Sequence, residues 1–125
     1  MECNKLNIPE HWHRNPDGSY DVDGNACLTK DYVQNGRLLV RIRKVSGNFS
    51  CKGIGLTTLE GSPREVAGYF NCSFNSLTTL QGKEVPQAVG GDFNCSVNLL
   101  TSLEGAPLIV NGTFNCSSNK LRTLA

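Results

Sequence analysis

Hydrophobic and polar positions recur along this chain with a period of just over twenty residues. The shared pattern is V-x-G-x-F-x-C-x-x-N-x-L-x-x-L-x-G-x-P, and its four copies begin at Val45, Val66, Val89 and Val110. These valines are 21, 23 and 21 residues apart, and an eroded copy begins at Val22, another 23 residues upstream. Such a period is typical of solenoids, in which each repeat forms one coil that stacks on the next.

The Phe-x-Cys step in each copy predicts a short β-strand. Residues two apart in a strand point to the same face, so the Phe and the Cys of each copy are expected to face the core. Strands of successive coils pair in parallel, about 4.8 Å apart, so equivalent side chains stack in columns. The expected columns are Phe49, Phe70, Phe93 and Phe114; Cys51, Cys72, Cys95 and Cys116; and the corner leucines Leu56, Leu59, Leu77, Leu80, Leu100, Leu103, Leu121 and Leu124.

An asparagine follows the predicted strand in three copies, as Asn75, Asn98 and Asn119. Its amide can bond to backbone groups that a turn leaves unpaired. Ile54 occupies this position in the first full copy, so that coil must satisfy its turn differently. The frequent Gly and Pro residues and the short period leave little room for helix.

The motif F-x-C-x-x-N-x-L-x-x-L resembles the core of leucine-rich repeats, L-x-L-x-x-N-x-L-x-x-L, most closely the short repeats of bacterial effector proteins. The longer form V-x-G-x-F-x-C-S-x-N-x-L-T-x-L-E-G-x-P is also similar to small repeat proteins of tailed bacteriophages. The resemblance covers residues 45–125 closely and 18–44 loosely. It implies a leucine-rich-repeat-like right-handed solenoid with a short parallel β-sheet on the concave side, an irregular convex side and little helix.

The pattern divides the chain into a cap and a stack. Residues 1–44 are expected to form an N-terminal cap that contains the degenerate repeat, covers the first coil with Ile8, Trp12 and Tyr20, and carries an inserted basic strand over 38–43 after an Asn35-Gly36 turn. The four coils are expected at 45–65, 66–88, 89–109 and 110–125.

The last copy is followed by no polar capping segment. Terminal coils of a solenoid expose apolar faces unless they are capped. We therefore expect another chain to cover this end, most simply in a symmetric homodimer. The residues expected at this surface are Phe114, Cys116, Leu121 and Leu124.

Composition narrows the function classes. The 125 residues carry a formal net charge of +1, which gives no case for bulk binding to nucleic acid or acidic membranes. No apolar run is long enough to cross a bilayer, and the polar N-terminus lacks the features of a secretory signal. The chain is therefore expected in the cytoplasm, that of a host bacterium if a phage encodes it.

The cysteines and histidines give no site for a metal or cofactor. Four of the six cysteines recur at one inward position, which favours buried thiols over disulfides, and the C-x₂₋₄-C pairs of zinc sites are absent. Cys3 and Cys27 are the two that can be exposed. His11 and His13 flank Trp12 and are read as part of the cap. No catalytic motif is present, so we expect a protein that is not an enzyme.

Binding in solenoids uses exposed positions of the strands and the loops beside them. In the middle two coils several apolar residues occupy positions that are not core positions, which favours either an exposed interface patch or local packing between those coils. The candidate interface residues are Tyr69, Asn71, Phe74, Asp92, Asn94, Val97 and Leu99.

A second candidate surface is electrostatic. Residues 30–52 hold six basic residues against one acidic residue, and Arg41 and Arg43 are expected on one strand face, opposite Val40 and Ile42. This strip could meet an acidic protein or a nucleotide, or it could be a solvated edge strand on which charge blocks unwanted pairing.

The leading hypothesis is a non-enzymatic module that binds a host bacterial protein, as the phage resemblance suggests, with inhibition of a defence component as one candidate role. One alternative is sequestration of a small anionic ligand, such as a nucleotide, by Arg41, Arg43 and a dimer groove. Another is a virion or assembly component.

Overall fold

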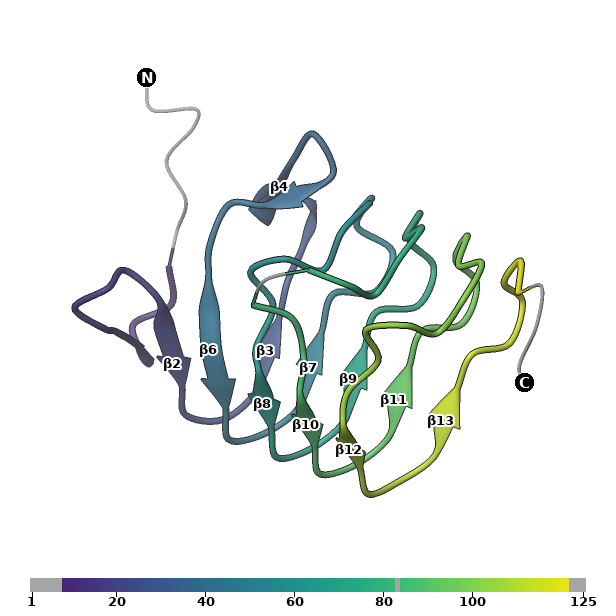
Figure 1. Ribbon diagram of the computed structural model, residues 1–125. Coiled ribbons are helices and arrows are strands. Elements are labelled where there is room, and N and C mark those ends of the chain that lie inside the picture. The colour runs from purple at the N-terminus through teal and green to yellow at the C-terminus, as the bar shows by residue number, and fades with distance from the viewer. Residues whose placement is uncertain (1–7, 83, 122–125) are drawn as a thin grey trace.

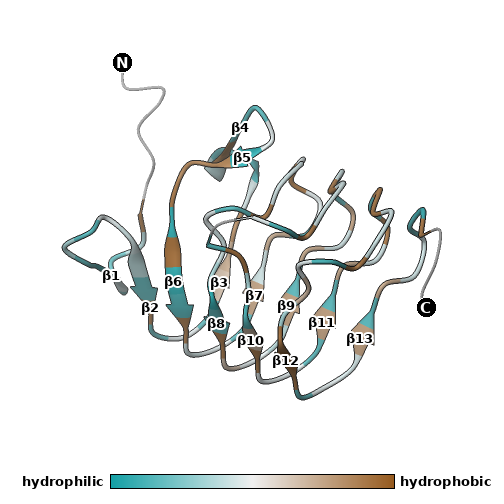
Figure 2. Cartoon of the chain, viewed as in Figure 1, coloured by the Kyte–Doolittle hydropathy of each residue, from teal (hydrophilic) through white to brown (hydrophobic). Residues whose placement is uncertain are grey.

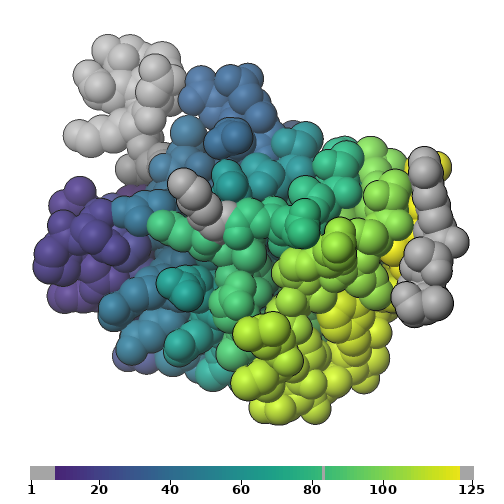
Figure 3. All heavy atoms as spheres, in the orientation of Figure 1, coloured from purple at the N-terminus to yellow at the C-terminus, as the bar shows by residue number. Residues whose placement is uncertain are grey.

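The computed structural model describes residues 8–82 and 84–121, which form a β-solenoid of stacked coils (Figure 1). Each coil contributes one strand to each of two sheets. The colours of the space-filling view run in bands from purple to yellow along the molecule, because each coil packs on its sequence neighbours (Figure 3). The short parallel sheet and the small helix content that were predicted are confirmed: the described residues contain one 3₁₀ turn, Lys30–Tyr32.

We call the predicted sheet the phenylalanine sheet. Its strands pair in parallel with no shift in register, so that Phe49, Phe70, Phe93 and Phe114 lie directly opposite one another. Ring centroids of successive phenylalanines are 4.9, 5.3 and 5.2 Å apart. The strands are β3 (Ala26–Cys27), β7 (Phe49–Ser50), β9 (Phe70–Asn71), β11 (Phe93–Asn94) and β13 (Phe114–Asn115).

The sequence did not predict the second sheet, which we call the valine sheet. It is parallel except for its first strand, β1, which pairs antiparallel with β2. The repeated valine is the inward residue at the end of each parallel strand, and Val22, Val45, Val66 and Val89 are buried. The strands, in spatial order, are β1 (Trp12–Arg14), β2 (Tyr20–Val22), β6 (Ile42–Val45), β8 (Glu65–Val66), β10 (Ala88–Val89) and β12 (Ile109–Val110).

The core is the set of columns that the repeat predicts. Phe49, Phe70 and Phe93 have no exposed surface, and the same holds for Cys51, Cys72 and Cys95. The first three corner-leucine pairs are buried except for Leu103, which is half-buried. All five cysteines of the described residues are free thiols, and Cys27 is exposed.

The asparagines close the bends as predicted, and they also serve the preceding coil. The Asn75 amide donates to the carbonyls of Cys72 and Ser73 in its own coil and of Cys51 in the coil before. Its Oδ1 accepts from the backbone N–H groups of Ile54 and Leu56. The coil that has Ile54 in place of an asparagine is therefore completed by the next coil.

The N-terminal cap contains the degenerate coil. Val22 pairs with Val45 and Ala26 pairs with Phe49, so Ala26 takes the phenylalanine position. Trp12 is buried at the end of the stack, with its ring centroid 5.8 Å from those of both Tyr20 and Tyr32.

The single inserted strand predicted over 38–43 is wrong. Asn35 and Gly36 do form a turn, between β4 (Val33–Gln34) and β5 (Arg37–Leu38), but the chain then bends at 39–40 and β6 begins at Ile42. The alternation still holds across this break, since Val40 and Ile42 are buried. The bend is needed because β5 belongs to a separate hairpin and β6 to the valine sheet.

The last described coil is less covered than the others. Val110, Phe114, Cys116 and Leu121 are half-buried, whereas the equivalent residues of the coil before are fully buried. Leu124 lies outside the described residues.

Candidate functional site

The apolar residues singled out in the middle coils are on the surface. The exposed fraction is 44% for Tyr69, 55% for Phe74 and 41% for Leu99, and Val97 is half-buried. Phe74 and Val97 occupy the same position in neighbouring coils, three residues after β9 and β11 end. Of the two readings, the exposed patch agrees with these positions better than local packing does.

Phe74 and Val97 have left-handed backbone conformations, with φ of 59° and 52°. The equivalent residues in the outer coils, Gly53 and Ser118, have φ of 64° and 54°, so the position itself requires this conformation. Left-handed backbone costs an L-residue about 1–2 kcal/mol, and a β-branched residue such as valine is rare there. Phe74 recovers part of this cost from Lys52, whose Nζ lies 5.3 Å from the ring centroid.

Tyr69 replaces a residue that stabilises the bend between the two sheets. In the coils on either side, Asn48 Oδ1 accepts from the Tyr69 backbone N–H, and Asp92 Oδ1 accepts from the Thr113 N–H. A tyrosine ring has no acceptor at this short reach, so Tyr69 cannot make the corresponding bond to the next coil. An exposed aromatic residue therefore stands where a structural hydrogen bond is formed in neighbouring coils.

The polar candidates on the phenylalanine strands mainly stabilise the fold. Asn71 and Asn94 are half-buried. The Oδ1 of Asn71 accepts from both the backbone N–H and the hydroxyl of Ser73, and Asn94 does the same with Ser96. Together with Asp92, whose carboxylate caps Thr113, these side chains form a rigid polar strip between Tyr69 at one end of the strands and Phe74 at the other.

Arg41 and Arg43 lie elsewhere, at the start of the valine sheet, and both are paired. Arg41 Nη1 is 3.1 Å from Glu84 Oε2, and its other amino group donates to the Asp17 carbonyl. Arg43 donates hydrogen bonds to both oxygens of Asp21, from Nε to Oδ1 at 2.9 Å and from Nη2 to Oδ2 at 2.5 Å. Hydrogen bonds from Arg43 lower the pKa of Asp21, and the same contact raises the pKa of Arg43. The fold thus brings each arginine an acidic partner, Glu84 or Asp21, from outside the basic segment 30–52.

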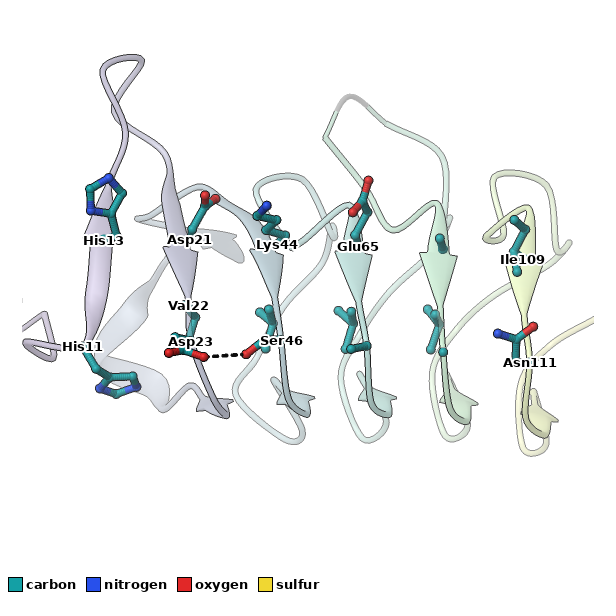
Figure 4. Close-up of a pocket in the computed structure, with 16 residues that line it drawn as sticks. His11, His13, Asp21, Val22, Asp23, Lys44, Ser46, Glu65, Ile109 and Asn111 are labelled. Atoms are coloured by element: carbon teal, nitrogen blue, oxygen red, sulfur yellow. Dashed lines mark hydrogen bonds between the residues drawn. The ribbon is translucent and has the colours of Figure 1, made fainter.

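A groove that the sequence did not predict lies on the outer face of the valine sheet. Its volume is about 750 Å³, and it runs across the strands between two rows of side chains (Figure 4). The rows come from the residues on either side of Trp12 and of each inward valine. By strand register and sequence, one row is His13, Asp21, Lys44, Glu65, Ala88 and Ile109, and the other is His11, Asp23, Ser46, Ala67, Gly90 and Asn111.

These groove positions differ in every coil, so no repeated signature marks them. A signal is nevertheless present in the sequence: the residues flanking each repeated valine vary, while the valine does not. Recognising it required knowing that the valine is the last residue of a strand in a second sheet.

Within residues 8–82 and 84–121, no group of three or more His, Cys, Asp or Glu side chains is arranged to hold a metal ion. In the same part of the chain, no helix has the length and apolar character required to span a membrane.

Comparison of the chain with protein-family models, curated proteins and solved structures finds no match.

Proposed function

We propose that this protein is a non-enzymatic module that binds another protein through the outer side of the phenylalanine sheet. The contact residues in this proposal are Phe74, Val97 and Leu99 at one end of the strands and Tyr69 at the other. The observation that carries it is the left-handed backbone of Phe74 and Val97, with φ of 59° and 52°. Strained residues that keep apolar side chains at the surface are characteristic of functional positions.

The chemistry of this surface suits a protein partner. Exposed aromatic side chains are the usual anchors of protein interfaces, and they are most effective when a rigid framework holds them. Here the Asn71–Ser73 and Asn94–Ser96 hydrogen bonds hold the strip between the anchors. Such a surface needs little ordering when a partner binds.

The partner that we propose is a bacterial host protein, a defence component being one candidate. This step depends on the resemblance of the V-x-G-x-F-x-C repeat to leucine-rich repeats and to small phage repeat proteins. It places the module in the bacterial cytoplasm. A role in virion assembly is the alternative within the same resemblance, and proteomics of purified particles distinguishes the two.

The test is affinity capture from a bacterial lysate with the native chain and with the Phe74→Gly/Tyr69→Asn double variant. Both substitutions install the residue found at the same position of the first full coil, Gly53 or Asn48, so the fold should be retained. We expect the native chain to capture a specific protein and the double variant to lose it. A Leu39→Ser variant, which removes an exposed apolar side chain from another surface, should capture normally. Equal capture by all three chains would refute the proposed surface.

A small anionic ligand is the second candidate function. Its support is weaker, because Arg41 and Arg43 are engaged by Glu84 and Asp21. A thermal-shift screen with nucleotides tests it, since a ligand that binds only the folded chain raises the melting temperature.

We also propose that two copies pair through the coil that begins at Val110. The half-buried Val110, Phe114 and Cys116 support this pairing. Light scattering should give the mass of two chains at micromolar concentration and of one chain for Phe114→Glu. A native chain that is monomeric throughout this range would contradict the pairing.

A further inference from the structure

The groove over the valine sheet changes in character along its length. Its carboxylates, Asp21, Asp23 and Glu65, and its one lysine, Lys44, all belong to the first coils of the stack. The lining of the later coils is uncharged and includes Ala88, Gly90 and Ile109. Figure 2 shows the same change: β2 is teal, whereas β10 and β12 are brown.

Two of the three carboxylates keep free acceptor capacity. Asp21 is occupied by Arg43 on both oxygens. The only contact found for Asp23 among the described residues is the Ser46 hydroxyl, which is 3.0 Å from Oδ1 (Figure 4). In the same part of the chain, Glu65 forms no ion pair, although Lys44 lies beside it in register. A ligand can therefore reach a carboxylate on each wall of the groove.

The balance of charge favours a cationic group on the ligand. Asp21 is paired with Arg43, so the unpaired carboxylates of the groove, Asp23 and Glu65, outnumber its one ammonium, Lys44, and this balance disfavours a phosphate or nucleic acid. In the uncharged half, Ala88 and Gly90 are small, and Gly90 cannot carry a side chain because an added Cβ would lie 2.2 Å from the Ala67 carbonyl oxygen. This leaves a hollow that an apolar side chain of the ligand can fill.

We propose that this groove binds an extended segment of a polypeptide that carries a lysine or arginine and, a few residues away, a large apolar side chain. The basic group pairs with Asp23 beside β2, Glu65 adds to the negative charge along the path, and the apolar group lies over Ala88 and Gly90 at β10. Three strand spacings separate β2 from β10, a distance of about 14 Å. An extended chain spans this distance with about five residues. The site is on a different sheet from Phe74 and Tyr69, so it does not depend on the function proposed above.

Fluorescence polarisation with labelled five-residue peptides tests this inference. The probes are Lys-Thr-Ser-Thr-Leu and its reverse, Leu-Thr-Ser-Thr-Lys, because either chain direction satisfies the two contacts. The controls replace Lys by Glu or Leu by Ser. We expect one probe to bind at least about tenfold more tightly than both of its controls, and to bind more weakly as salt is raised.

Three variants locate the binding. Glu65→Lys should weaken it at least about fivefold through like-charge repulsion, and Ala67→Trp should abolish it by filling the groove from an exposed position. Glu104→Lys makes the same charge change outside the groove and should leave the dissociation constant within about twofold. Circular dichroism and urea unfolding of each variant establish that the fold is retained.

Any one of four results would overturn the proposal. The first is equal binding of the lysine and glutamate peptides, and the second is binding that Ala67→Trp leaves intact. The third is no binding of either probe to a chain that circular dichroism shows to be folded. Displacement of a bound probe by ATP would likewise assign the groove to an anionic ligand instead.

Discussion

The side-chain oxygen of Asn48 accepts a hydrogen bond from the backbone N–H of Tyr69, one coil further on, at 2.9 Å. A Cβ added to Gly68 would lie 2.0 Å from that same oxygen. Gly68 does not have a left-handed φ, so its own backbone geometry does not require glycine. The glycine of the V-x-G step is needed here mainly because the Asn48 side chain occupies the space, and the Gly47 carbonyl oxygen, 2.9 Å from the added Cβ, restricts it further.

Gly68→Ala should therefore destabilise the chain by about 2 kcal/mol through overpacking. In an Asn48→Ala background the same change should be less harmful, because the clashing oxygen is gone. Urea unfolding followed by circular dichroism measures the double-mutant cycle. Strictly additive losses would mean that the Asn48 contact is not the cause.

Asn98→Ala should be among the most damaging single polar changes in the stack. The buried Asn98 amide donates to the carbonyls of Cys72, Cys95 and Ser96, and its Oδ1 accepts from the Leu77 N–H. Its loss leaves buried backbone groups unpaired, which we expect to cost about 3 kcal/mol in the free energy of unfolding.

Asn111→Ala is the matched control, since Asn111 is exposed at the end of the groove. Its free energy of unfolding should stay within about 0.5 kcal/mol of the native value. A loss at Asn98 no larger than that at Asn111 would contradict the role given to the asparagine column.

Gly53→Ala tests the backbone strain on which the proposed interface rests. Gly53 has φ of 64°, and an added Cβ would meet no atom closer than 3.9 Å, so only the conformation opposes alanine. We expect a loss of about 1 kcal/mol. The converse change, Ser118→Gly, should stabilise the chain by a few tenths of a kcal/mol. Chemical denaturation measures both, and a neutral Gly53→Ala would remove the strain inferred at Phe74 and Val97.

The inner thiols should make the stability fall at alkaline pH. Burial raises the pKa of Cys95 to about 12 and raises the pKa values of Cys51 and Cys72 as well. In the unfolded chain these thiols lose their protons near pH 9 while the folded chain keeps them, so the stabilisation present below pH 9 is lost as pH rises towards 12. For three thiols the expected loss between pH 8 and pH 10 is about 4 kcal/mol.

Urea unfolding at the two pH values measures this loss, and Cys27→Ser serves as the control because Cys27 is exposed. That variant should show the same pH dependence as the native chain. A thiol reagent at pH 8 should modify Cys27 rapidly and Cys51, Cys72 and Cys95 only on unfolding. Rapid modification of all of them in the folded chain would contradict the buried column.

The sequence was sufficient for the phenylalanine sheet because Phe and Cys alternate, with the Phe in each strand and the Cys directly after it, and these two inward residues establish a period of two. The valine sheet has one inward residue per repeat, as in Glu65–Val66, so it leaves no alternation to detect. The antiparallel β1 occurs once and has no repeat to reveal it.

Part of the candidate surface could be predicted because the repeat allows equivalent positions of different coils to be compared. Phe74 and Tyr69 stand out because they differ from Gly53 and Asn48 at the same repeat positions. The neutralisation of Arg43 could not be predicted in this way, since Asp21 reaches it only through the pairing of β2 with β6. Contacts between residues more than twenty positions apart depend on register, which local patterns do not give.

Because Asn75 forms hydrogen bonds with the coil before it, the coils are completed in a fixed order during synthesis. On a ribosome the bend at Ile54 stays open until Asn75 has been synthesised, because that residue supplies the partners of the Ile54 and Leu56 N–H groups. Asn98 and Asn119 reach back in the same way, to the N–H groups of Leu77 and Leu100. Each of the first three full coils is thus completed only by its successor, and the growing chain carries one unfinished turn at its leading end.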